Sequence, residues 1–116
     1  MQYRLTARHF DPPMRLKQYV DKEVKRLQKF YRGIIDCEVI LYPEKLLQVA
    51  EIQLKVNGAL LTAVEKTEDM FKSVDLAVEK IERQLKKHKE KVRDHSGEKL
   101  GKLLKEAEKE RTETTL

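Results

Sequence analysis

Six Lys and Arg side chains are concentrated within residues 83–93, with a single Glu among them. They are Arg83, Lys86, Lys87, Lys89, Lys91 and Arg93. One or two cations near the end of a helix are favoured by the helix dipole, but six in one block repel one another. Such a block is typical of a surface that binds a polyanion, although a Lys-rich helix end can also be only a solvated face. The chemistry predicted here is electrostatic contact with phosphates.

The element that carries this block is predicted to be a long amphipathic helix beginning near Glu68. Its apolar positions recur every three or four residues. They are Phe71, Val74, Ala77, Val78, Ile81, Leu85, His88 and Val92. Residues 68–82 contain five acids and two bases, and we expect acids in the first turn, where the helix dipole favours them. One helix is thus predicted to have an acidic first half and a basic second half.

A second basic surface is predicted on an earlier helix that ends near Phe30. Asp11 is its expected cap, proline is expected at its first position, and Gly33 is expected to end it. Four bases share one face by three- and four-residue spacing: Lys22, Lys25, Arg26 and Lys29. If both helices lie on one side of a sheet, this face and the 83–93 block can border a basic channel for a nucleic-acid backbone. Shape and phosphate contacts would then dominate over base readout.

Four strands are predicted from alternating apolar and polar residues at 3–7, 37–41, 50–56 and 59–65. Pro43 to Lys45 marks one turn, and Asn57-Gly58 is a strong hairpin signal. The order β-α-β-β-β-α predicts an α+β fold, a four-stranded sheet with two helices packed on one face and one parallel strand pair. We predict a domain over residues 1–95 and a charged tail over 96–116, in which Leu100, Leu103, Leu104 and Ala107 have the spacing of a short helix.

Other functional classes find little support in the chain. Catalysis is not predicted, because the three histidines have no metal-ligand spacing with Cys37 and the four glycines are scattered. Cys37 is expected to be a buried small hydrophobe rather than a nucleophile. No cofactor, membrane partner or small-molecule substrate is expected, and the single cysteine and the polar N-terminus predict a cytoplasmic protein. Few aromatic residues and no Trp argue against a base-stacking platform.

Several short motifs, in order along the chain, resemble one known family. They are Met1-Gln2, Val56-Asn57-Gly58, Asp69-Met70, Asp75 and Arg83-Gln84-Leu85 followed by Lys87-His88-Lys89 and Lys91. The chain resembles the short form of the ribosome hibernation-promoting factor / ribosome-associated inhibitor family, also described as sigma-54 modulation proteins. The resemblance extends from Met1 to about His95.

This resemblance implies a non-enzymatic protein that binds the small ribosomal subunit and its ribosomal RNA at the decoding region, inhibiting translation in stress or stationary phase. It implies RNA contacts by Arg83, Lys87, His88, Lys89 and Lys91, with Lys86 and Arg93 as local additions. His88 could instead orient the cluster, since it lies on the apolar stripe. Promotion and prevention of ribosome pairing both stay open, because the tail departs from the family pattern.

Two alternatives are kept beside this interpretation. One is a protein–protein regulator that acts through the tail or a sheet edge. The other is a general binder of structured RNA, because α-β-β-β-α also occurs in the double-stranded RNA-binding domain. The extra first strand and the position of the basic block at the end of the second helix argue against that domain.

Overall fold

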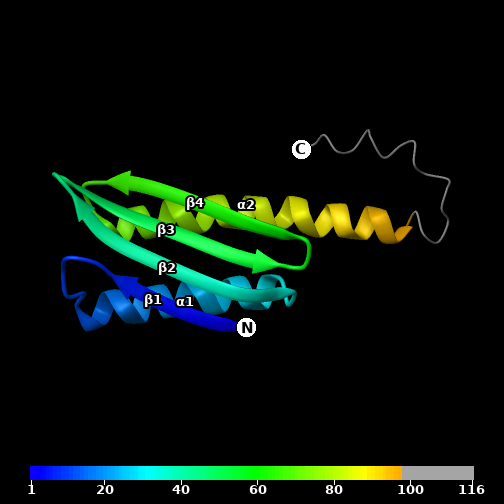
Figure 1. Ribbon diagram of the computed structural model, residues 1–116, viewed down its shortest axis with the longest axis horizontal. Coiled ribbons are helices and arrows are strands. Elements are labelled where there is room, and N and C mark those ends of the chain that lie inside the picture. Colours follow the sequence, from blue (N-terminus) through cyan, green and yellow to red (C-terminus); the bar gives the residue numbers. More distant parts are fainter. Residues whose placement is uncertain (98–116) are drawn as a thin grey trace. The chain divides into compact units, whose positions relative to one another are not determined.

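The computed structural model describes residues 1–97, and their side chains as far as Lys91. It confirms the predicted order of elements (Figure 1). The elements are β1 (Gln2–Ala7), α1 (Met14–Phe30), β2 (Ile34–Glu44), β3 (Leu47–Val56), β4 (Ala59–Thr67) and α2 (Met70–Gly97). The chain divides into two compact units within α2, after Glu82, and each unit is described by itself below. The helix continues to Gly97, two residues beyond the predicted domain boundary, and the tail beyond it lies outside the described residues.

The strands form one sheet in the order β1-β2-β3-β4. β1 and β2 are parallel, as predicted, and the other two pairs are antiparallel. A parallel pair needs a crossover connection, and α1 supplies it. Within residues 1–82 the helices lie on one face of the sheet, behind it in Figure 1. This confirms the predicted α+β fold.

The face of the sheet that carries the core is the one that the alternation predicts. In β3, Ile52, Leu54 and Val56 are almost completely buried, whereas Lys55 is exposed and Glu51 is half-buried. Cross-strand neighbours continue this apolar face, since Cys37 lies opposite Leu54 and Val39 opposite Ile52. A slip of one residue would turn this face to solvent, so the burial fixes the register.

The two hairpin turns differ in how well the sequence predicts them. Asn57-Gly58 forms the predicted two-residue turn between paired Val56 and Ala59, with Gly58 at φ 87°. The other turn is Lys45-Leu46 rather than Pro43 to Lys45, because Pro43 still belongs to β2. β1 ends opposite Leu41, so beyond that point β2 has only one neighbouring strand. Proline is tolerated in such an edge position, where a missing N–H leaves no partner unsatisfied.

The first helix begins and ends differently from the prediction. Its N-cap is Pro13, without a side-chain cap hydrogen bond, so Asp11 is not the cap. Met14 holds the first helical position that was predicted for proline, and the ring of Pro13 has no acceptor atom for a side-chain cap bond. At the other end, extended Tyr31 donates its N–H to the Leu27 carbonyl. Gly33 comes later, where a Cβ would lie 2.8 Å from atoms of the Tyr31 ring.

The second helix begins at Met70, so the predicted acids precede its first turn rather than occupy it. Asp69 Oδ1 accepts the N–H of Phe71 at 3.1 Å, which is the capping interaction that short acidic side chains favour. The fully buried Ser73 hydroxyl donates to the Gln48 carbonyl at 2.7 Å. That bond ties the first turn of α2 to β3 and fixes where the helix lies against the sheet.

Candidate nucleic-acid interface

The basic block lies on the second half of α2, as predicted. Five of its cationic side chains are exposed: Arg83, Lys86, Lys87, Lys89 and Lys91. The Arg93 side chain lies outside the described residues. Arg83, Lys87 and Lys91 are spaced four residues apart, so they form one row along the helix.

Most of these cations are not neutralised by a neighbouring acid. Arg83, Lys86, Lys87 and Lys91 form no ion pair with a carboxylate of the described residues. A cation without an acidic partner keeps its full charge for an incoming anion. The second half of α2 therefore has the electrostatic character that phosphate binding requires.

His88 differs from the cations around it. Its side chain is half-buried, and burial lowers the pKa of its imidazole, with a further lowering by the charge of Lys91. Both effects favour the neutral form of the imidazole. This favours the interpretation in which His88 orients the cluster, and an RNA contact by His88 stays a prediction.

The four predicted bases of α1 are all exposed and lie off its buried stripe, but they are not equivalent. Arg26 contacts two carboxylates, Glu23 at 3.1 Å and Glu82 of α2 at 3.0 Å. The hydrogen bond to Glu82 is the main reason why the pKa of Arg26 is raised. Lys25 and Lys29 form no ion pair with a described carboxylate. The two sides of the predicted channel, this face and the 83–93 block, belong to different units, so the channel stays a prediction.

Two acids in the first half of α2 contact side chains of α1. Besides the Glu82 contact, Asp75 accepts a hydrogen bond from the Tyr19 hydroxyl of α1. That bond, with some burial, raises the pKa of Tyr19 to about 12. Lys80 forms an ion pair with Glu65 of β4 at 3.0 Å. The predicted change of sign along α2 therefore accompanies a change from Asp75 and Glu82, which have partners in α1, to four cations that form no ion pair with a described carboxylate.

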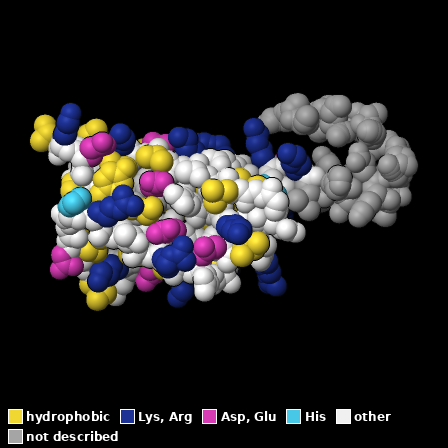
Figure 2. Space-filling view, in the orientation of Figure 1, with side chains coloured by type: hydrophobic (Ala, Val, Ile, Leu, Met, Phe, Trp, Pro, Cys, Tyr) yellow, Lys and Arg dark blue, Asp and Glu magenta, His cyan; other side chains and the backbone are white. Residues whose placement is uncertain are grey.

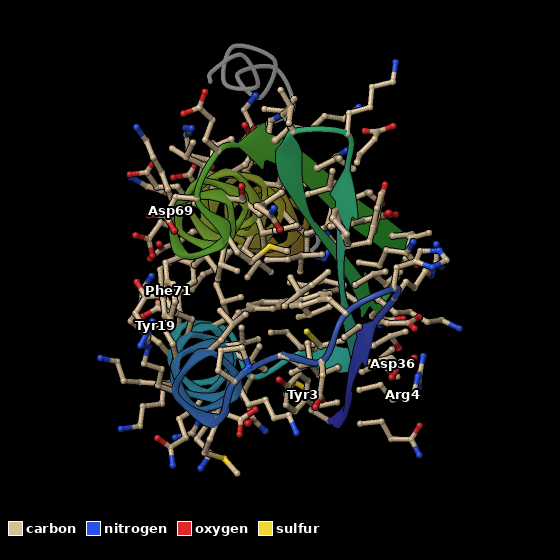
Figure 3. The ribbon with its side chains drawn as sticks, turned by 90° about the vertical axis from the view of Figure 1, so that its left-hand side faces the viewer. Tyr3, Arg4, Tyr19, Asp36, Asp69 and Phe71 are labelled. Carbon is tan, nitrogen blue, oxygen red and sulfur yellow. The ribbon has the colours of Figure 1, made fainter. Side chains whose placement is uncertain are left out.

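An aromatic pair lies where α1 and α2 meet, and the sequence did not predict it. Tyr19 and Phe71 are half-buried, with ring centres 5.5 Å apart and planes inclined by 57°. Figure 3 shows the two side chains between the helices, on the side away from the sheet. Arg15 and Lys22 each lie over one of these rings. Helical spacing placed Phe71 on the apolar stripe of its helix, whereas the structure leaves this ring half-buried beside Tyr19.

The opposite face of the sheet carries charges of both signs. Arg4 contacts Asp36 and Glu38 at 3.4 Å, and Lys66 contacts Glu44 at 2.9 Å. Figure 2 shows Lys, Arg, Asp and Glu side chains interspersed on this face. A mixed surface of this kind does not attract a polyanion as a one-sign surface does. The sheet face is therefore a natural control for the helix surface.

Cys37 is fully buried, as predicted. Burial, followed by the charge of Asp36, raises the pKa of its thiol to about 12. A thiol held in this way is not a nucleophile at pH 7, because the thiolate is the reactive form. No helix of the described part is long and apolar enough to span a membrane.

Comparison with known proteins adds information about the family and the fold. A family model described as Sigma 54 modulation protein / S30EA ribosomal protein matches residues 3–93. A protein of Azotobacter vinelandii named ribosome hibernation promoting factor is 38% identical over 91 residues, covering 78% of this chain and 85% of that protein.

Two solved structures are similar in fold. A ribosomal subunit interface protein from Coxiella burnetii has a TM-score of 0.72 and 29% identity, over 77% of this chain and 98% of that chain. The N-terminal domain of Thermus thermophilus Protein Y has a TM-score of 0.68 and 28% identity, over 76% of this chain and 99% of that chain. The family match includes the basic residues of both helices.

Proposed function

Because the chain belongs to the Sigma 54 modulation protein / S30EA ribosomal protein family, we propose that it promotes ribosome hibernation as a non-enzymatic ribosome-binding protein. It acts in the cytoplasm under stress or in stationary phase. It binds ribosomal RNA of the small subunit at the decoding region and inhibits translation there.

The observation that carries this proposal is that the family match spans residues 3–93 and so includes the whole basic block of α2. The relatives reported above are named for ribosome hibernation and for the interface between ribosomal subunits. The unpaired cations on the second half of α2 support the same function, because ribosomal RNA is the densest polyanion that a ribosome offers. They would supply the binding charge.

The type of cation also indicates how the RNA is recognised. Four of the exposed block residues are Lys, which acts as a flexible point charge rather than as a planar fork. Contacts of that kind fix position on the phosphate backbone and carry little sequence information. In this proposal the ribosome is recognised by the shape and charge of its folded RNA.

Within residues 1–91, whose side chains are described, the side-chain chemistry favours binding over catalysis. The buried thiol of Cys37 is not a nucleophile, and burial lowers the pKa of the half-buried His88 imidazole. No group of three or more His, Cys, Asp or Glu side chains of the described residues is placed to hold a metal ion. What the helix surface offers a partner is charge.

The ionic strength dependence of binding tests the proposal. The protein is sedimented with purified ribosomes from low to high salt, and the logarithm of the binding constant is plotted against the logarithm of salt concentration. Contacts with several phosphates predict a steep linear decrease, with about 0.7 to 0.9 units of slope for each contact. Binding that does not change with salt would instead support the protein–protein regulator. Equal binding to an unrelated structured RNA would support the general RNA binder.

A further inference from the structure

We infer that the junction of α1 and α2 holds an unpaired RNA base, which stacks on the guanidinium of Arg15 where that group lies over Phe71. This inference rests on the proposed function and adds a second kind of contact to it. The site consists of two rings and two cations: Phe71 and Tyr19, with Arg15 and Lys22.

Three contacts connect the four groups. The Arg15 guanidinium carbon lies 5.4 Å from the ring centre of Phe71, and Phe71 lies 5.5 Å from the ring centre of Tyr19. The Lys22 ammonium lies 5.7 Å from that second ring centre. Arg15 and Lys22 are two turns apart on α1, or about 10 Å along its axis. A short single-stranded segment can therefore meet both cations.

The rings are held in place before any ligand arrives. The backbone of Phe71 is fixed by the Asp69 cap, and that turn is tied to β3 by Ser73. The hydroxyl of Tyr19 donates to Asp75, which joins the Tyr19 side chain of α1 to α2. A preorganised site of this kind loses little conformational entropy on binding.

The chemistry of Arg15 selects a base rather than a phosphate alone. RNA-binding proteins stack unpaired bases on aromatic rings and on Arg guanidinium planes. Arg15 is exposed, so an incoming base can reach its guanidinium next to the Phe71 ring. Lys22 supplies a point charge for a neighbouring phosphate. The site is small, which agrees with a chain that has few aromatic residues.

Substitution of Arg15 by Lys tests the inference, since it keeps the charge and removes the planar group. Binding to purified small ribosomal subunits is measured over a salt series for R15K and the parent protein. Stacking predicts that R15K binds about fivefold more weakly or worse with an unchanged salt slope. R15K that binds as tightly as the parent would overturn the inference.

The matched control is R8K on the other face of the sheet. Arg8 lies over the Tyr42 ring at 5.7 Å, so R8K removes a guanidinium from an equivalent contact with a ring, away from the proposed site. R8K is expected to bind as the parent does. An equal loss in R8K and R15K would mean that the effect arises from altered packing and not from a base, and would overturn the inference.

Ultraviolet crosslinking of the complex gives a readout that a structural role of Arg15 would not produce. A base stacked on the guanidinium is expected to crosslink to the peptide that carries Arg15. Crosslinks confined to residues 83–93 would contradict the inference and leave the proposed function intact. Failure of the parent protein to bind small subunits would instead reject the proposed function itself.

Discussion

The two halves of α2 carry opposite charges and use them in different ways. In the first half, acids are engaged with groups of residues 1–82: Asp75 with Tyr19 and Glu82 with Arg26. In the second half, Arg83 and Lys87 are exposed and form no ion pair with a described carboxylate. The first half thus stabilises the fold, and the second half presents charge. The number of Lys and Arg residues on a surface is a poor guide to its affinity for RNA, because paired cations must first be released.

The largest effect is expected from the double variant K87Q/K91Q. It removes two unpaired cations of one row, so the salt slope of ribosome binding should become shallower by about 1.4 to 1.8 units. Glutamine is a good helix former, and both side chains are exposed, so the change in stability should stay within about 0.5 kcal/mol. Sedimentation over a salt series and thermal unfolding give the two values. An unchanged slope would mean that the basic block is only a solvated helix end.

The variants K25Q and R26Q compare an unpaired with a paired cation on the same face of α1. K25Q should lower the magnitude of the salt slope by about 0.7 to 0.9 units. R26Q should change it much less, because Arg26 is held by Glu23 and Glu82. R26Q should instead lower the free energy of unfolding by under about 1 kcal/mol, which is typical of exposed ion pairs. Equal salt slopes for the two variants would show that the ion pairs of Arg26 with Glu23 and Glu82 break at little cost when RNA binds.

The variants E82Q and E79Q separate the release of Arg26 from the loss of a negative charge. Both remove one carboxylate of α2, but only Glu82 contacts Arg26. E82Q should therefore strengthen ribosome binding more than E79Q and give a slightly steeper salt slope. The salt slopes of the two variants should differ by less than the value for one phosphate contact, which is about 0.7 to 0.9 units, because Glu23 still holds Arg26. Identical behaviour of the two variants would contradict a restraining role of Glu82.

The smallest effect concerns His88. Because its pKa is lowered in the folded protein, the folded state binds this proton less tightly than the unfolded chain. The stability from this group is thus complete above about pH 6.5, the unfolded value, and is lost as pH falls from there through the lowered pKa. The melting temperature of H88Q should therefore fall less than that of the parent protein when the pH is lowered from 7 to 5. A larger loss in H88Q would show that the histidine is stabilised by its charge.

The fold was largely predictable because it depends on periodic patterns. Alternation in β3 identified its buried face, and Asn57-Gly58 identified one hairpin. The position of the other turn was not predictable, because it depends on β1 ending opposite Leu41. Likewise Asp11 is not the cap, because Pro13 holds the N-cap position.

The candidate interface was predictable only in part, for a related reason. The 83–93 block lies within a few turns of one helix, so helical spacing alone defines its rows. The pairing of Arg26 with Glu82 and the contact of Tyr19 with Phe71 join residues far apart in the chain. No local pattern indicates such contacts. The sequence therefore identified which cations are present but not which of them are free of acidic neighbours.

Directed cleavage of ribosomal RNA from a probe on the protein tests the central claim most directly. The only natural cysteine, Cys37, is fully buried, so a cleavage reagent can be attached selectively to an introduced Glu90→Cys or Leu60→Cys. Glu90 lies within the basic block, and Leu60 is exposed on β4 opposite Lys55, on the face away from the core. The account predicts strong cleavage of small-subunit RNA at the decoding region from position 90 and little from position 60. Strong cleavage from position 60 with none from position 90 would contradict it.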